Sequence, residues 1–209
     1  MGRSFSSPAG LGVYLSVILR PECAAQELMH LTCAAAVAMC DAVESAAGFR
    51  PGIKWTNDLV YGTKKLGGIL TELSADSKSG LIDYAVVGIG INCNQSMEDF
   101  PPELRSIATS LSLVNGQPMA PTRLAAAMIG ALVTMDQALL TQKPHVMAAY
   151  RNDCVTLGRE VVFLQTQQEY PATAVDLDEN GGLIVRLRDG SFRTVTSGEV
   201  SVRGMYGYI

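Results

Sequence analysis

The chain has 209 residues, 48% of them hydrophobic and 17% charged, and a formal net charge of −4; these values suit one or two folded domains and exclude a disordered polypeptide. No basic run predicts a nucleic-acid surface, and no uninterrupted apolar stretch predicts a signal peptide or a membrane-spanning helix. The five cysteines include no CxxC pair and are typical of reduced thiols, so we expect a cytoplasmic protein that binds neither nucleic acid nor membrane.

Strand and helix patterns alternate in the first half of the chain. Residues 24–47 place apolar side chains at three- and four-residue steps, which predicts an amphipathic helix ending at Gly48. The apolar run 83–92 barely alternates, which predicts a strand buried on both faces. The other predicted strands lie at 10–19, 53–61 and 65–74.

Irregular structure and helices are predicted next. Four prolines between residues 96 and 121 predict irregular structure, with a short helix near Ala108. A helix is predicted at 122–140, with Thr122 as its N-cap, and a second helix at 144–152.

The pattern of apolar and turn-forming residues changes past Thr156. Short apolar and β-branched runs alternate there with turns rich in glycine, asparagine and aspartate, which is typical of a small barrel. We therefore predict two domains, residues 1–155 and residues 156–209. The predicted strands of the second domain lie at 161–164, 170–175, 183–187 and 192–195.

The richest set of polar groups lies at Lys54–Leu59 and Lys64–Leu70. Such a stretch can hold an anion, because lysine supplies positive charge, aspartate takes a divalent cation and glycines let backbone amides approach closely. A second interpretation stays open, in which the Lys-Lys pair is a solvated surface feature of a hairpin loop. The glycines within Val87–Asn92 are ambiguous in the same way, since glycine in a strand also marks a bulge or close packing.

The order of these motifs resembles the catalytic core of biotin–protein ligases. Lys-Trp-x-Asn-Asp-Leu begins at Lys54, Lys-Leu-Gly-Gly-Ile-Leu-x-Glu at Lys65, and Val-Gly-Ile-Gly-Ile-Asn at Val87. Gly2–Pro8 is similar to the end of that family's arginine- and glycine-rich loop, and the resemblance resumes at Gly198–Arg203. The resemblance implies an α+β fold, with a mixed sheet that has helices on one face, followed by a small SH3-like β-barrel.

The resemblance also implies an activity. In this family biotin attacks the α-phosphate of ATP to give biotinyl-5′-adenylate and pyrophosphate, and a carrier lysine then attacks the mixed anhydride to form an amide. Biotin and ATP are thus the expected substrates, with Mg²⁺ to neutralise the phosphates. The expected partner is the biotin carboxyl carrier protein domain of an acyl-CoA carboxylase, and we also expect either a homodimer or an exposed sheet edge.

Residue roles follow from the same resemblance. Lys65 matches the family's catalytic lysine, whose ammonium would lie between the carboxylate and the α-phosphate, remove their repulsion and stabilise the transition state. Asp58 is the expected magnesium ligand. The remaining expected contacts are those of Arg3, Asn57, Asn92 and Arg203 with ATP, and those of Arg3, Lys65, Gly68, Gly88 and Gly90 with biotin.

The chain departs from the family pattern in two places. Thr56 stands where the family usually has proline, which changes the stiffness of the loop and removes no ligand. The family segment that precedes Gly2, a strand with a Thr-Asn pair and most of the arginine-rich loop, has no counterpart. We therefore expect an N-terminally truncated ligase with an incomplete biotin site and weak activity. Without a winged-helix region in the sequence, we expect no repressor activity.

Two other functions fit parts of the pattern. A lipoate ligase or lipoyl transferase resembles the same fold, although the three core motifs fit the biotin branch better. A non-catalytic binding module would retain part of the pocket and the barrel, which the departure before Gly2 would explain. Titration with biotin, lipoate and ATP, followed by a carrier-modification assay, separates the three functions.

Overall fold

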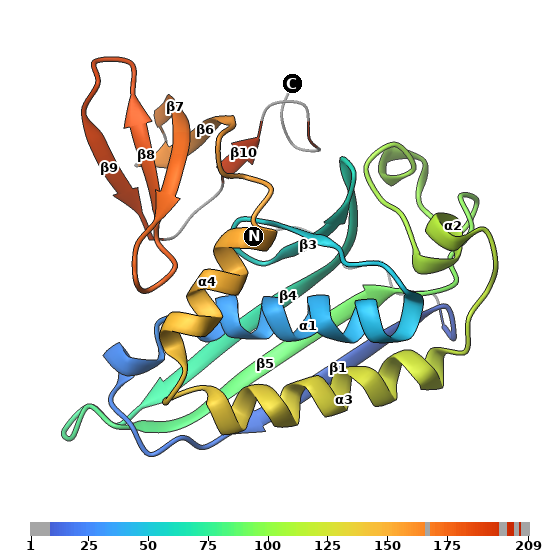
Figure 1. Cartoon of the computed structure of the whole chain (residues 1–209), viewed down its shortest axis with the longest axis horizontal. Coiled ribbons are helices and arrows are strands. Elements are labelled where there is room, and N and C mark those ends of the chain that lie inside the picture. The colour runs from blue at the N-terminus through green and yellow to red at the C-terminus, as the bar shows by residue number, and fades with distance from the viewer. Residues whose placement is uncertain (1–8, 166–167, 197–199, 203–204, 206–209) are drawn as a thin grey trace.

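A computed structural model describes residues 9–165, 168–196, 200–202 and 205. Its named strands form two five-stranded antiparallel sheets, and the helices pack mainly on the first (Figure 1). The first sheet has the order β1 (Gly12–Leu19), β5 (Ile82–Asn92), β4 (Lys64–Ala75), β3 (Asp58–Tyr61) and β2 (Gly52–Lys54). The second has the order β10 (Val200–Val202), β6 (Glu160–Gln165), β7 (Gln168–Leu177), β8 (Leu183–Leu187) and β9 (Phe192–Val195).

Helices cover only one face of the first sheet (Figure 1). On that face lie α1 (Leu31–Ala47) and α3 (Pro121–Ala138), while α4 (Lys143–Asp153) runs from the end of α3 toward the second sheet. The opposite face carries exposed side chains such as Tyr14, Ile18 and Leu70. The shorter helical elements are two 3-10 turns, Ala25–Leu28 and Pro102–Leu104, and α2 (Leu111–Asn115).

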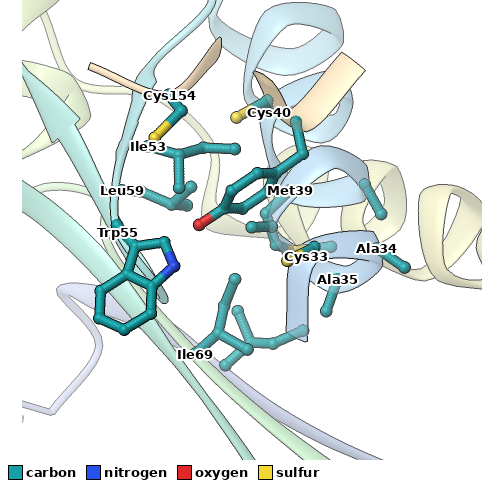
Figure 2. Close-up of a cluster of buried hydrophobic side chains, with 14 of the residues drawn as sticks. Cys33, Ala34, Ala35, Met39, Cys40, Ile53, Trp55, Leu59, Ile69 and Cys154 are labelled. Carbon is teal, nitrogen blue, oxygen red and sulfur yellow. The ribbon is translucent and has the colours of Figure 1, made fainter. Parts of the chain in front are cut away.

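Helix α1 lies close to the sheet because its buried residues are mostly small. Cys33, Ala34 and Ala35 are all buried, as are Met39 and Cys40 further along the helix (Figure 2). The end of α1 is set by Gly48, as the sequence predicts: its φ of 81° is left-handed, and its amide donates to the carbonyl of Glu44. The strand side of this cluster is formed by Ile53, Trp55, Leu59 and Ile69 (Figure 2).

All five cysteines are buried and free of disulfide bonds. Burial raises the pKa of the Cys33 thiol to about 12, and it also raises the pKa of Cys154. Both therefore stay protonated at neutral pH and act as small apolar side chains.

The segment Ala25–Ala47 is long and apolar enough to cross a membrane, with a mean hydropathy of 1.2 in its most apolar window. Within the fold, 67% of that window is buried inside the protein. Its apolar character is therefore accounted for by packing against the sheet and α3.

The structure corrects several local predictions. The predicted helix 24–47 is interrupted after the 3-10 turn, and α1 begins only at Leu31. The N-cap of α3 is Ala120 rather than Thr122, because Pro121 occupies the first helical position, which its fixed φ favours. The short helix predicted near Ala108 lies further on, at α2.

Strand β5 is buried on one face and not on both. Ala85, Val87, Ile89 and Ile91 are buried under the helices, whereas the residues between them are partly exposed. The first sheet was predicted to be mixed, but every pairing between its named strands is antiparallel. Parallel pairing is limited to two isolated bridges in the described residues, Ile53–Cys154 and Lys65–Ala108.

Polar contacts join the second sheet to the first part of the chain. The Trp55 indole N–H donates to the carbonyl of Gly181 at 2.8 Å, and the Trp55 backbone amide donates to the Thr156 hydroxyl at 2.9 Å. Gly181 lies in the turn between β7 and β8, where an added Cβ would meet Cys33 Sγ of α1. The turn thus packs closely against the motif that begins at Lys54.

Candidate active site on the open face of the sheet

One cross-strand row runs through all five strands of the first sheet. Lys54 of β2 is paired with Asp58 of β3, Asp58 with Gly68 of β4, Gly68 with Gly90 of β5, and Gly90 with Tyr14 of β1. Directly opposed residues in an antiparallel sheet share a face. The row therefore places residues from all three sequence motifs on the face that the helices leave open.

Lys65 reaches the same face through an irregularity in the pairing of β3 with β4. Side chains alternate along a regular strand, so Lys65 and Gly68, three residues apart, would point to opposite faces. The register shifts between Leu59 and Val60, which leaves Leu66 as an extra residue in β4. The shift turns Lys65 toward Asp58 and leaves Leu66 fully buried.

Lys65 and Asp58 form an ion pair, with 2.5 Å between Nζ and Oδ1. The lysine side chain is 42% exposed and the aspartate side chain 17% exposed, so the pair is open to solvent on the lysine side. A Cβ added at Gly68 would lie 3.3 Å from Asp58 Oδ1 and 3.3 Å from Lys65 Nζ. The absence of a side chain at Gly68 thus leaves room for the pair.

A shallow hollow lies beside the row, over β1 and β5. It measures about 300 Å³ and is lined by Tyr14, Ser16, Gly88 and Gly90 together with the intervening Leu15 and Ile89. Gly88 faces Ser16 on one side and Leu70 on the other, and a Cβ at Gly88 would meet nothing closer than 3.8 Å. The two glycines therefore form a floor of backbone on which a flat ring can lie.

The two predicted asparagines hold backbone groups around this face. Asn57 Nδ2 donates to the carbonyl of Ile69 at 2.6 Å, and the Ile69 amide donates to the carbonyl of Asn57 at 2.9 Å. Asn92, at the end of β5, donates through Nδ2 to the carbonyl of Thr109 at 2.9 Å. Both side chains thus fix loops at the edges of the site.

The electrostatic character of the face comes from two lysines and a carboxylate. Lys54 is buried and lies directly opposite Asp58. A negative ligand on this face would therefore meet the exposed ammonium of Lys65. Partial burial raises the pKa of the Tyr14 hydroxyl, and a hydrogen bond with Gln95 opposes that rise. No cluster of three His, Cys, Asp or Glu side chains occurs in the part of the chain that the structure describes.

The predicted site residues meet different outcomes. Asp58, Lys65, Gly68, Gly88 and Gly90 lie on one face in adjoining strands, and only Gly88 and Gly90 line the hollow itself. Arg3 and Arg203 lie outside the residues that the structure describes.

Three residues of this face are absent from the predicted set. Lys54 could have been found, since it opens the Lys-Trp-x-Asn-Asp-Leu motif. Tyr14 and Gln95 carried no signal, because an aromatic residue in a strand and a glutamine in a loop are ordinary at the level of sequence.

Two family models match the chain. Residues 1–92 match the biotin/lipoate A/B protein ligase family, and residues 156–203 match the biotin protein ligase C-terminal domain. The first match gives the class of protein, ligases for biotin or lipoate. The second match narrows this class to the biotin ligases. The two matches together support the biotin protein ligase family, and the second makes the C-terminal sheet SH3-like.

Individual relatives agree with the family match. The chain is 45% identical over 117 residues to the bifunctional ligase/repressor BirA of Bacillus spizizenii, which covers 56% of this chain and 35% of that protein. It is 29% identical over 204 residues to the biotin–[acetyl-CoA-carboxylase] ligase of Mycobacterium tuberculosis, covering 95% and 72%. The chain thus spans about a third of the length of the Bacillus protein.

A solved structure extends the likeness to three dimensions. The biotin protein ligase from Aquifex aeolicus in complex with biotin and ATP superposes with a TM-score of 0.76 at 27% identity. The superposition covers 92% of this chain and 78% of that one. The fold predicted from sequence, an α+β domain followed by an SH3-like element, is confirmed by this similarity.

Proposed function

We propose that this chain attaches biotin to a lysine of a biotin carboxyl carrier protein, using ATP and passing through biotinyl-5′-adenylate. The observation that carries the proposal is the cross-strand row, which sets the Lys65–Asp58 pair beside the glycine-floored hollow on one open face. The Aquifex relative of the same fold is described as a complex with biotin and ATP. Residues 1–155 would form the catalytic domain and residues 156–209 the SH3-like barrel domain.

The hollow fits the ring of biotin. A flat bicyclic ring would lie on the backbone of Gly88 and Gly90 between Tyr14 and Leu70, and aromatic and apolar side chains of this kind line most ligand pockets. Its carboxylate tail would then extend over Gly68 toward Lys65. In the first step a carboxylate oxygen bonds to the α-phosphorus of ATP, and the bond from that phosphorus to the bridging oxygen breaks to release pyrophosphate.

Lys65 would act by charge. Its ammonium is held by Asp58 and is accessible from solvent, so it can exchange one negative partner for others when the substrates bind. Placed between the carboxylate and the α-phosphate, it would reduce their repulsion and stabilise the charge that develops during the transfer. Lys54, opposite Asp58, is a second positive charge in the same row and is buried.

Asp58 is suited to be the protein's carboxylate ligand of Mg²⁺. Mg²⁺ in nucleotide sites is bound by one or two carboxylates together with phosphates and water, and Asp58 offers a single, partly exposed carboxylate on the open face. Bound Mg²⁺ would neutralise phosphate charge. The side-chain amides of Asn57 and Asn92 donate hydrogen bonds to backbone carbonyls. Each asparagine would therefore lie beside the nucleotide and keep its own loop in place. Arg3 and Arg203 complete the proposed set of ATP contacts, and Arg3 also that of biotin.

The second step needs a carrier protein. The amine of a carrier lysine would attack the carbonyl of the adenylate, forming the amide and releasing AMP. We propose the biotin carboxyl carrier protein domain of an acyl-CoA carboxylase as this partner, because the Mycobacterium relative is named for that enzyme. We also propose that the reaction takes place in the cytoplasm, where thiols such as the five free cysteines stay reduced.

A homodimer through the first sheet has one structural support. Strand β3 pairs with β4 only as far as Gly68, so residues 70–75 of β4 have no strand on that side among the described residues. Leu70 and Leu73 in this stretch are exposed, and unpaired sheet edges favour association. Sedimentation should reveal a dimer at high concentration, and a monomer throughout, with and without biotin and ATP, would contradict it.

The test of the activity is a substrate panel. The purified chain is supplied with ATP, Mg²⁺ and either biotin or lipoate, and pyrophosphate release is measured before a carrier domain is added. Release with biotin, followed by biotin on the carrier lysine, supports the proposal. Release with lipoate alone would assign the chain to the lipoate branch, and binding of biotin without pyrophosphate release would make it a binding module.

A further inference from the structure

A buried polar cluster lies at the end of β5, outside the set of predicted site residues. Gln95 is only 1% exposed, and its Nε2 donates to Asn92 Oδ1 at 3.1 Å. Gln95 Oε1 is buried and has no hydrogen-bond partner among the described residues. The contact of Nε2 with Asn92 is thus the one by which the Gln95 side chain holds the end of β5.

The cluster continues to the backbone of Lys65. Asn92 donates to the carbonyl of Thr109, and the Thr109 amide donates to the carbonyl of Lys65 at 2.8 Å. The Lys65 amide in turn donates to the carbonyl of Ile107 at 2.7 Å. The segment 107–109 therefore holds Lys65 by both of its backbone groups, at the place where the pairing of β3 with β4 is irregular.

We propose that Gln95 is a positioning residue, which holds Lys65 in place for adenylate formation through a relay of hydrogen bonds that runs from Gln95 through Asn92 and Thr109 to Lys65. The inference rests on the proposed function, since Lys65 is the residue to be positioned. A glutamine suits the task because its Nε2 donates to Asn92 Oδ1, which fixes the Asn92 amide with its Nδ2 toward the carbonyl of Thr109. The relay makes the loop that follows β5 and the reacting lysine parts of one network.

Gln95 also fixes the segment from its backbone. The Ser110 hydroxyl donates to the carbonyl of Gln95 at 2.6 Å and accepts from the amide of Leu113 as the N-cap of α2. The side chain and the carbonyl of Gln95 thus both lead to the residues that follow Ala108. Loss of the side chain alone would leave the carbonyl contact, so the segment should shift by a small amount and not unfold.

The neighbouring Asn94 provides a matched control. Its Nδ2 donates to the carbonyl of Met119 at 2.8 Å, and its Oδ1 accepts from the Met119 amide at 3.0 Å. These two hydrogen bonds lead to the start of α3, and none of them leads to Lys65. A change at Asn94 therefore removes amide contacts from the same loop without touching the relay.

The experiment compares Gln95→Met with Asn94→Leu, each replacing an amide by an apolar group of similar shape. For Gln95→Met we expect kcat for pyrophosphate release to fall about three- to tenfold, with little change in the KM for ATP. The amides of Lys65 and Thr109 should exchange their hydrogens severalfold faster. Asn94→Leu should leave kcat and both amides as in the wild type. Equal behaviour of the two variants would overturn the proposal.

A second variant tests the relay itself. Gln95→Asn keeps an amide and shortens the side chain, so this variant should fold even if Gln95→Met does not. Its amide no longer reaches Asn92 Oδ1, so exchange at the Thr109 amide should again be severalfold faster. Unchanged exchange in Gln95→Asn would refute the relay. If the wild type releases no pyrophosphate, the proposed function fails while hydrogen exchange still decides the relay.

Discussion

The two faces of the first sheet are built from the same strands and serve opposite purposes. The covered face presents Leu59, Ile69, Val87 and Ile91 to α1 and α3, and all four are buried. The open face presents glycine, lysine and aspartate in the row that crosses all five strands. Alternation along each strand thus separates packing from chemistry.

Glycine shows the difference most clearly, because it occurs on both faces for different reasons. On the covered face, a Cβ at Gly67 would lie 2.5 Å from the carbonyl oxygen of Gly90. On the open face, a Cβ at Gly88 would be in ordinary contact at 3.8 Å. The fold needs a glycine at position 67, because a side chain there would clash with the backbone. It would accept a side chain at Gly88, so a glycine in the strand at that position indicates a functional reason.

The largest effect should come from Lys65 on the open face. Lys65→Met should lower the rate of pyrophosphate release by about 10²–10³-fold, because it removes a charge aimed at the reacting anions. Its side chain is exposed enough that the free energy of unfolding should change by less than about 0.5 kcal/mol.

Lys64→Met is the matched control for this change. Lys64 is paired with Tyr61 at the turn end of β4 and belongs to no part of the proposed site, so its variant should keep most of the activity. Steady-state kinetics and thermal unfolding of both variants decide the matter. Similar losses of activity in the two would leave Lys65 as an ordinary surface lysine.

The second effect concerns Gly67 on the covered face. Gly67→Ala should destabilise the fold by about 1–3 kcal/mol, because the atoms that the new methyl group meets, the Gly90 carbonyl oxygen and Ile91 Cα, belong to the backbone of β5. The same substitution at Gly130 in α3, where a Cβ meets nothing within 4 Å, should stabilise it by up to about 1 kcal/mol. Chemical denaturation measures both, and equal stability of the two variants would contradict the packing argument.

The third effect concerns Gly88 on the open face. Gly88→Val should retain or slightly raise the melting temperature, since valine favours strands and the space is open. It should weaken biotin binding by roughly 10- to 100-fold, because the side chain would fill the hollow. Titration calorimetry checks the affinity. A stable variant that binds biotin normally would show that the biotin ring does not bind in this hollow.

The covered face could be predicted from the sequence more fully than the open face. Helix and strand patterns were sufficient for most elements because burial imposes their periods. β5 was wrongly predicted to be buried on both faces, since the glycines at 88 and 90 are no less apolar than their neighbours and have no side chain to reveal a polar face. A sequence pattern shows how polar each side chain is, but it does not show whether another element covers that face of the strand.

The open face depends on features that no local pattern encodes. The register shift that turns Lys65 toward Asp58 leaves no mark in Lys64–Leu70, because any residue could be the extra one. The hydrogen bond from the Thr109 amide to the Lys65 carbonyl joins residues 44 positions apart in the sequence, and it exists only once the segment 107–109 packs beside β4. The motifs nevertheless identified Asp58, Lys65 and the glycines, since their order resembles one family.

The smallest effect should come from His30, which is buried at the start of α1 on the covered side. It is 1% exposed, and its Nε2 lies 2.9 Å from the carbonyl oxygen of Leu139 at the end of α3. Burial lowers the pKa of His30, and the charge of Lys143 acts in the same direction, against the hydrogen bond to Leu139. The imidazole is therefore neutral in the folded protein at neutral pH.

Because the folded pKa is lowered, the unfolded chain binds a proton at His30 at a higher pH than the folded chain does. The free energy of unfolding should thus fall as the pH drops through about 6.5, the usual histidine value. His30→Gln should flatten this dependence between pH 7.5 and about 5, whatever it does to stability at neutral pH. His145, the chain's other histidine, is exposed on α4, so His145→Gln should reproduce the wild-type profile. Urea denaturation across this range distinguishes them, and a wild-type profile in His30→Gln would show that the buried histidine does not govern the acid side.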